Sequence, residues 1–238
     1  MAVRKNPDQT PAMRQFHHFK KQYPDCVIFF RMGDFYEMFH DDAKLANRVL
    51  GVTLTQRSKG IPMAGVPYHA VENYLRRMIQ AGYRVAVCDQ VEDPKQATGV
   101  VKRDVTRLVT PGTLTDETLL EAGRTSPLAA LAIGQDRAQV AWAELSTGAF
   151  AVADFELDEV ADELARVAPS ELLYAETSDG ERPRLVQSLT QSLSCAFTGR
   201  PAWQFRRGDA LKTLCKQYHV ATLAGFGLDD DEPVLGPA

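Results

Sequence analysis

An aromatic residue and a carboxylate, Phe35 and Glu37, stand two positions apart in the segment FYEMF of this 238-residue chain. Side chains at positions i and i+2 of an extended segment point to the same face, so these two would project together. If Phe35 belonged to the core, the charge of Glu37 would be carried towards the core as well, which is costly for an unpaired carboxylate. The spacing therefore favours a joint role for the ring and the carboxylate at the surface.

Carboxylates suggest a second kind of chemistry, because a magnesium-dependent nuclease uses clusters of them. The candidate residues are Asp34, Glu37, Asp41, Asp42, Asp89, Glu92 and Asp93, with Lys95. Helix capping explains Asp41 and Asp42, and a Gly-Asp turn explains Asp34. A ribonuclease-H-like nuclease would also need an acidic residue in its first strand, but the run 128–133 has none. A metal-dependent nuclease remains the alternative, and a protein-interaction module is a third interpretation.

Other catalytic motifs find no support. The chain has no G-x-x-x-x-G-K-[ST] loop and no G-x-G-x-x-G after a strand, so we expect no ATP hydrolysis by this chain. The histidines lack metal-ligand spacing, and the four cysteines are far apart, as expected of buried apolar residues in a reducing compartment. The sequence thus predicts no catalytic residue, metal ligand or disulfide framework.

The charge of the chain is distributed unevenly. Residues 1–125 hold 18 Lys and Arg against 14 Asp and Glu, whereas residues 126–238 hold 9 against 17. Only the first half is therefore suited to face a polyanion, and its small excess implies help from other segments. No run of about 18 uncharged apolar residues and no signal peptide occurs, which predicts a cytoplasmic chain that does not bind membranes.

Periodicity and turn residues predict a mixed α/β first half, residues 1–120. We expect helices from Pro11 to Pro24, from Asp41 to Gly51 and from His69 to Ala81, and a loop over Arg57–Tyr68, where Gly and Pro recur. The expected strands are Cys26–Met32, Phe35–Phe39, Val52–Gln56, Arg84–Gln90 and Asp104–Thr110.

The second half, residues 121–238, opens with three strands separated by hairpin signals: Leu128–Ile133, Gln139–Leu145 and Ala149–Phe155. A helix (Leu157–Ala168), a strand (Glu171–Tyr174) and helices over Leu185–Leu193 and Ala210–Tyr218 follow. This order is ribonuclease-H-like. The acidic tail Asp229–Glu232 is expected to be solvated.

Several longer segments resemble the amino-terminal part of the bacterial MutS family of DNA mismatch-repair proteins. They are FFRMGDFYEMF (29–39), DAK (42–44), IPMAGVPYHAVENY (61–74), VTPGT (109–113) and GFG (225–227). The resemblance implies a mixed-sheet mismatch-recognition domain, MutS domain I, followed by a ribonuclease-H-like connector, MutS domain II. The lever, clamp and ATPase regions of the family have no counterpart here, so we expect an amino-terminal fragment without enzyme activity. ATP and magnesium would be cofactors of the full-length family only.

The resemblance also implies roles for individual residues. Phe35 would wedge into the minor groove at a mispaired or unpaired base, and Glu37 would hydrogen-bond that base. Residues in or beside the matching motifs would contact the DNA backbone or groove: Arg31, Arg57, Lys59, Met63, His69, Arg76 and Arg103. The implied partners are mismatched or looped double-stranded DNA, the remaining MutS domains, a second MutS subunit and MutL, in a cytoplasmic, nucleoid-associated setting.

Overall fold

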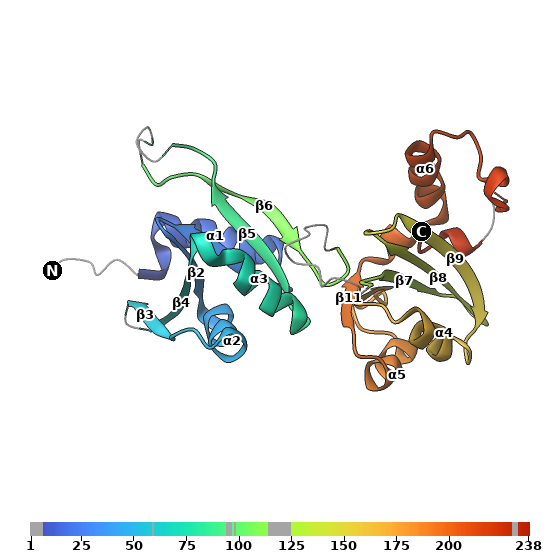
Figure 1. The fold of residues 1–238 in the computed structure, drawn as a ribbon, viewed down its shortest axis with the longest axis horizontal. Helices are drawn as coiled ribbons and strands as arrows, with labels where there is room; N and C mark the ends of the chain where they lie inside the picture. Colours follow the sequence, from blue (N-terminus) through green and yellow to red (C-terminus); the bar gives the residue numbers. More distant parts are fainter. Residues whose placement is uncertain (1–6, 59, 94–96, 98, 114–124, 230–232) are drawn as a thin grey trace. The chain divides into compact units, whose positions relative to one another are not determined.

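The computed structural model describes residues 7–58, 60–93, 97, 99–113, 125–229 and 233–238. The chain divides into two compact units, the first reaching Thr110 and the second beginning at Pro111 (Figure 1). The boundary expected near residue 120 lies outside the described residues. No helix in the described part of the chain is long and apolar enough to cross a membrane.

The first unit is built on a six-stranded mixed sheet with the order β3-β4-β2-β1-β5-β6. β1 and β5 are parallel, and the other neighbours are antiparallel. The strands are β1 (Cys26–Met32), β2 (Phe35–Phe39), β3 (Thr55–Ser58), β4 (Ile61–Pro67), β5 (Arg84–Gln90) and β6 (Arg103–Val109). β2 is thus paired on both sides, which fixes its backbone.

Helices cover both faces of this sheet. On one face, α1 (Pro11–Gln22) buries Met13, Phe16 and Phe19 against alternate residues of β1 and against Phe39. As expected, α1 begins at the cap Thr10, whose Oγ1 accepts a hydrogen bond from the Met13 N–H, with proline as its first residue. Helices α2 (His40–Leu50) and α3 (Val71–Gln80) pack on β4 and β5, and short helical turns, η1 (Pro7–Gln9) and η2 (Tyr68–Ala70), precede α1 and α3.

Asp42 has a larger role than the capping expected of it. Its carboxylate is buried in the first turn of α2, accepts the Ile28 N–H at 3.0 Å and pairs with Lys20 Nζ at 2.8 Å. The acid therefore joins α2 to β1 and α1. Burial raises the pKa of Asp42 above its ordinary value, although the Ile28 and Lys20 hydrogen bonds oppose that rise.

The loop expected over Arg57–Tyr68 is wrong, because β4 is an interior strand of the sheet. Its prolines, Pro62 and Pro67, stand near the two ends of the strand, where a missing N–H is best tolerated. Ala64 and Val66 alternate towards the buried face between them. β3 also starts later than expected, because its pairing with β4, including a bulge after Gln56, determines where the strand lies.

The second unit contains a five-stranded sheet with the order β11-β10-β7-β8-β9. Three antiparallel strands come first: β7 (Leu128–Ile133), β8 (Arg137–Glu144) and β9 (Ala149–Glu156). β10 (Glu171–Ala175) then runs parallel to β7, and β11 (Ala196–Arg200) parallel to β10. This is the ribonuclease-H-like order that the sequence predicts, although β11 was not among the expected strands because AFTGR lacks a clear apolar alternation.

Helices α4 (Val160–Val167) and α5 (Arg184–Ser192) cover one face of this sheet. Near the other face lie η3 (Ala202–Phe205) and η5 (Pro233–Leu235), with α6 (Arg207–Tyr218) and η4 (Ala224–Phe226) between them in the chain (Figure 1). Residues 230–232 of the acidic tail lie outside the described residues. Val234 and Leu235, which follow it, are buried.

Candidate nucleic-acid interface

Phe35 and Glu37 lie above the same side of the first sheet. In the strand register Phe35 stands between Met32 of β1 and Pro67 of β4, and Glu37 is paired with Gly65 of β4. A Cβ atom added to Gly65 would lie 3.7 Å from Cδ1 of Phe35 and 4.0 Å from Cγ of Glu37. Because Gly65 has no side chain, the sheet surface beside Phe35 and Glu37 is left uncovered at this position.

The two side chains differ in exposure. Phe35 is 47% exposed, whereas the neighbouring Tyr36 and Met38, which point to the opposite face, are buried. A core role for Phe35 is thereby excluded. Only 19% of the Glu37 side chain is exposed, so the carboxylate is more covered than a joint surface role would require.

Arg57 explains how Glu37 is tolerated in this position. Nη1 of Arg57, on β3, donates a hydrogen bond to Oε2 of Glu37 at 2.9 Å. Burial raises the pKa of Glu37 above its ordinary value, and the charges of Arg57 and Arg103 only partly offset that effect. This ion pair could not be predicted from local patterns, because Arg57 meets Glu37 only through the pairing of β2, β4 and β3.

The raised pKa of Glu37 can be measured directly. We expect the midpoint of its carboxyl titration, followed by carbon-13 NMR, to lie above the ordinary value of 4.5. The folded chain then takes up this proton before the unfolded chain does. Its contribution to stability is present below the unfolded pKa and is lost as the pH rises through the folded pKa. Arg57→Gln should raise the midpoint further, and a wild-type midpoint at or below 4.5 would contradict this assignment.

Two more of the expected contact residues lie on the same face but are turned inward. Arg103 is buried, donates to the carbonyl oxygens of Arg31 and Val101 at 2.6 and 2.7 Å, and lies over the Phe30 ring. Met63 is half-buried against the core under α1. Arg103 and Met63 therefore pack against the sheet around Glu37 and do not project into solvent towards a ligand.

Arg31 lies on the opposite face at the same end of the sheet. Its guanidinium stacks on the Tyr68 ring at 3.9 Å, and its Nε donates to the Gly33 carbonyl oxygen at 2.5 Å in the turn before Phe35. His69 is exposed beside Tyr68. Arg76 is half-buried on α3, and Lys59 lies outside the described residues. The structure thus gathers Phe35, Glu37 and Arg57 on one face, with Arg31 on the opposite face and His69 beside Tyr68 at the same end of the sheet.

Comparisons with known proteins identify the family of the chain. The model of MutS domain I matches residues 10–118, and the model of MutS domain II matches residues 126–238. The chain belongs to the MutS family. It is similar to the DNA mismatch repair protein MutS of Rhodopirellula baltica, with 43% identity over 249 residues. That match covers 94% of this chain and 27% of the relative, so the chain spans about a quarter of the relative's length.

Among the described residues of the MutS domain I unit, the carboxylates considered for a nuclease form no cluster of three metal-ligating groups. Asp89 accepts hydrogen bonds from Tyr36 Oη, at 2.5 Å, and from Thr106 Oγ1, and Asp41 pairs with Lys44. Burial and the hydrogen bond to Asp89 raise the pKa of Tyr36 to about 12. Lys95 lies outside the described residues. Within the described ranges, the group of three metal-ligating side chains contains none of these acids.

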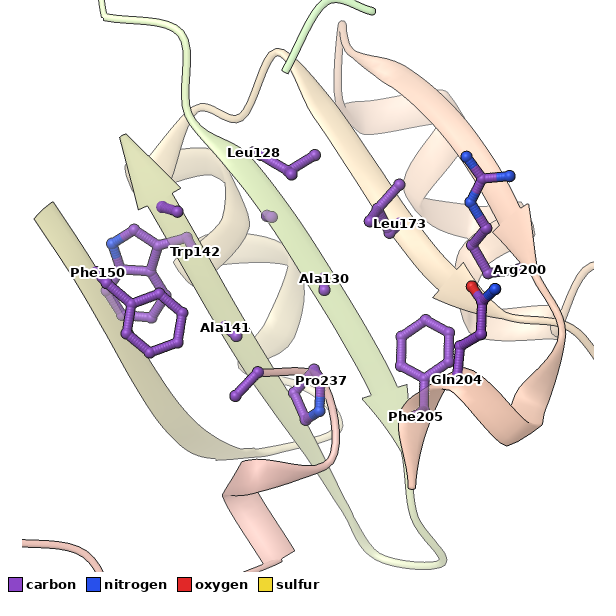
Figure 2. Close-up of a pocket in the computed structure, with 13 residues that line it drawn as sticks. Leu128, Ala130, Ala141, Trp142, Phe150, Leu173, Arg200, Gln204, Phe205 and Pro237 are labelled. Atoms are coloured by element: carbon purple, nitrogen blue, oxygen red, sulfur yellow. The ribbon is translucent and has the colours of Figure 1, made fainter. Parts of the chain in front are cut away.

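In the MutS domain II unit, a cavity of about 310 Å³ opens on the sheet face away from α4 and α5. Figure 2 shows Trp142 and Phe150 at one end, Phe205 beside Arg200 at the other, and Pro237 between them. Its lining is almost entirely apolar, with small alanine side chains along β7 and β8. Arg200 is the one cationic residue among the described residues of this lining, which offers little positive charge to a phosphate backbone. The cavity is therefore not included in the candidate interface.

Proposed function

We propose that this chain recognises mismatched or looped double-stranded DNA, with Phe35 as a wedge that enters the minor groove at a faulty base pair. The observation that carries this proposal is an aromatic side chain, 47% exposed, on a strand that is paired on both sides. Unstacking a base step costs a few kcal/mol, and less where the pairing is already faulty. Selectivity then comes from the deformability of the DNA.

Glu37 is the second residue of this reading head, which we define as Phe35 and Glu37 above Gly65. A carboxylate accepts a hydrogen bond from a base N–H, and a protonated carboxyl can donate one to a base nitrogen or oxygen. The raised pKa of Glu37 favours the protonated form more than in an ordinary glutamate. The ion pair with Arg57 holds the side chain in place while no base is present.

A titration of matched, single-mismatch and single-base-loop duplexes of equal length tests the function. Fluorescence anisotropy of labelled DNA should give tighter binding to the mismatched and looped duplexes. Equal affinity for all three duplexes would overturn mismatch recognition, and no binding to any of them would favour a protein-interaction module. The same duplexes incubated with magnesium or manganese should stay intact. Cleavage by the wild type that is lost in Asp34→Asn or Asp89→Asn would instead favour a metal-dependent nuclease.

Arg31 provides a prediction about the phosphate backbone. Its guanidinium is held against Tyr68 next to the turn that precedes Phe35, where it can approach a phosphate beside the wedge. Arg31→Gln should therefore weaken binding to matched and mismatched duplexes by the same factor. The slope of log K against log salt should become shallower by about 1. Arg48→Gln, which alters an exposed arginine on α2, is the control, and a change in mismatch preference in Arg31→Gln would contradict this assignment.

We further propose that the second unit transmits the DNA-bound state to the remaining MutS domains of a longer protein. A second MutS subunit and MutL are the partners proposed for that longer protein, and ATP and magnesium its cofactors. DNA binding by this chain should not depend on ATP. Calorimetric detection of ATP binding to the chain would contradict that expectation.

A further inference from the structure

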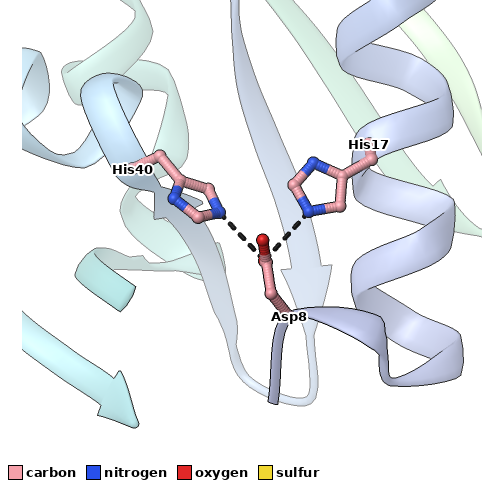
Figure 3. A group of neighbouring side chains, drawn as sticks. All are labelled: Asp8, His17 and His40. Atoms are coloured by element: carbon pink, nitrogen blue, oxygen red, sulfur yellow. Dashed lines mark hydrogen bonds and ion pairs between the residues drawn. The ribbon is translucent and has the colours of Figure 1, made fainter. Parts of the chain in front are cut away.

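Three side chains that can bind metals meet at one point in the first unit, outside the reading head. Nε2 of His17 lies 2.9 Å from Oδ1 of Asp8, and Nε2 of His40 lies 3.1 Å from the same oxygen. Figure 3 shows both imidazole rings directed at the carboxylate, from α1 on one side and from the start of α2 on the other. His17 and His40 follow Asp8 in the chain by 9 and 32 positions, and their hydrogen bonds to Asp8 join α1 and α2 to η1.

Packing fixes the two rings. The centroids of the two imidazole rings are 5.4 Å apart. Both rings pack against the buried Phe16, whose ring centroid lies 5.6 Å from that of His17 and 6.3 Å from that of His40. His40 also has a left-handed backbone, with φ of 55°, which a residue other than glycine rarely adopts. Between 33% and 42% of each of the three side chains is exposed, so an ion can reach them from solvent.

The geometry suits a small divalent ion. The three ligand atoms lie within 4.8 Å of one another. Bonds of about 2.0 to 2.2 Å place neighbouring ligand atoms roughly 3.0 to 3.5 Å apart. The two separations from Asp8 are already close to that range, and the third, between the two imidazole nitrogens, has to shorten from at most 4.8 Å.

The donor set selects the class of metal. Two imidazole nitrogens and one carboxylate oxygen suit zinc, cobalt or nickel, whereas calcium and magnesium prefer oxygen ligands throughout. Water can fill the remaining positions because the cluster is open to solvent. The histidines showed no metal-ligand spacing in the sequence, since the packing of α1 beside α2 brings them together.

We propose that Asp8, His17 and His40 bind one divalent transition-metal ion of the zinc class, which fastens η1 to α1 and α2. Because such an ion binds the folded chain and not the unfolded one, it should stabilise the first unit. The site is separate from the reading head, so this proposal does not depend on mismatch recognition.

Calorimetric titration of the chain with zinc chloride tests the site, using protein without a histidine tag and with its cysteines kept reduced. We expect one ion per chain. His17→Gln and His40→Asn should each weaken binding at least tenfold, and asparagine is chosen because it tolerates the left-handed backbone of residue 40. Asp8→Asn, on the short η1 segment, should do the same. His18→Gln is the matched control because His18 is the exposed neighbour of His17 on α1.

Two further measurements make the result decisive. Zinc should raise the melting temperature of the wild type and of His18→Gln but not of His40→Asn. Cobalt should give visible absorption bands without the near-ultraviolet band of a thiolate ligand, because no cysteine takes part. Zinc stoichiometry unchanged in the double variant His17→Gln/His40→Asn, a thiolate band, or no binding to the wild type would each overturn the proposal.

Discussion

Replacing Phe35 with alanine should remove the preference of the chain for mismatched DNA while leaving the fold intact. Stacking of one base on an aromatic ring contributes about 1 to 3 kcal/mol, so mismatched duplexes should bind roughly 5- to 150-fold more weakly. Matched duplexes, which resist unstacking, should lose much less. The melting temperature should hardly change, because the ring is exposed and the strand keeps its hydrogen bonds on both sides.

Phe226 supplies a matched control for this variant. It is also a phenylalanine, 57% exposed, but it belongs to η4 in the second unit. Phe226→Ala should leave both affinities unchanged, whereas Phe35→Trp should retain part of the preference. A large fall in melting temperature for Phe35→Ala would show that the ring packs in the core and is not available to DNA.

Glu37→Gln should strengthen binding to matched duplexes, whereas Phe35→Ala should weaken binding. The carboxylate is repelled by nearby phosphates at roughly 1 kcal/mol or more per close contact, and only a base whose edge is free compensates for that repulsion. The glutamine variant should therefore bind matched duplexes about fivefold more tightly. The ratio of mismatched to matched affinity should fall. Acidic pH should have the same effect on the wild type if the carboxyl is protonated in the complex.

Arg57 should contribute to the increased affinity of Glu37→Gln for matched duplexes. In the wild type its guanidinium pairs with Glu37, and Glu37→Gln leaves that cation free to attract phosphates. The double variant Glu37→Gln/Arg57→Gln should lose most of the increase. Glu72→Gln, which breaks the ion pair with Arg107 at 2.8 Å in the same unit, is the control and should not alter mismatch preference. Equal loss of matched and mismatched binding in Glu37→Gln would refute the repulsion argument.

Local patterns predicted the features that depend on neighbouring residues. The two-residue spacing placed Phe35 and Glu37 on one face, and Thr10 with Pro11 marked the start of α1, because both depend on backbone geometry over a few positions. The antiparallel order of β7, β8 and β9 in the second sheet followed from hairpin signals for the same reason. Whether Phe35 and Glu37 contact DNA stays a prediction.

Features that depend on distant contacts were not predictable in this way. Pro62 and Pro67 concealed β4, since its place inside the sheet comes from β2 and β3 rather than from its own composition. Asp42 looked like a simple helix-terminal acid until α1 and β1 supplied Lys20 and the Ile28 N–H. Such partnerships arise from tertiary packing, which a single sequence does not disclose.

The double pairing of β2 has a consequence for the entropy of recognition. A probe on a flexible loop would lose backbone freedom each time it bound, and that loss would weaken binding to every site alike. Phe35 stands on a strand held by β1 and β4, so little further ordering is needed when a base stacks on it. In the proposed complex the protein would be preorganised, and the DNA would make the conformational change. Differences in affinity between duplexes should therefore report how readily each duplex bends and unstacks.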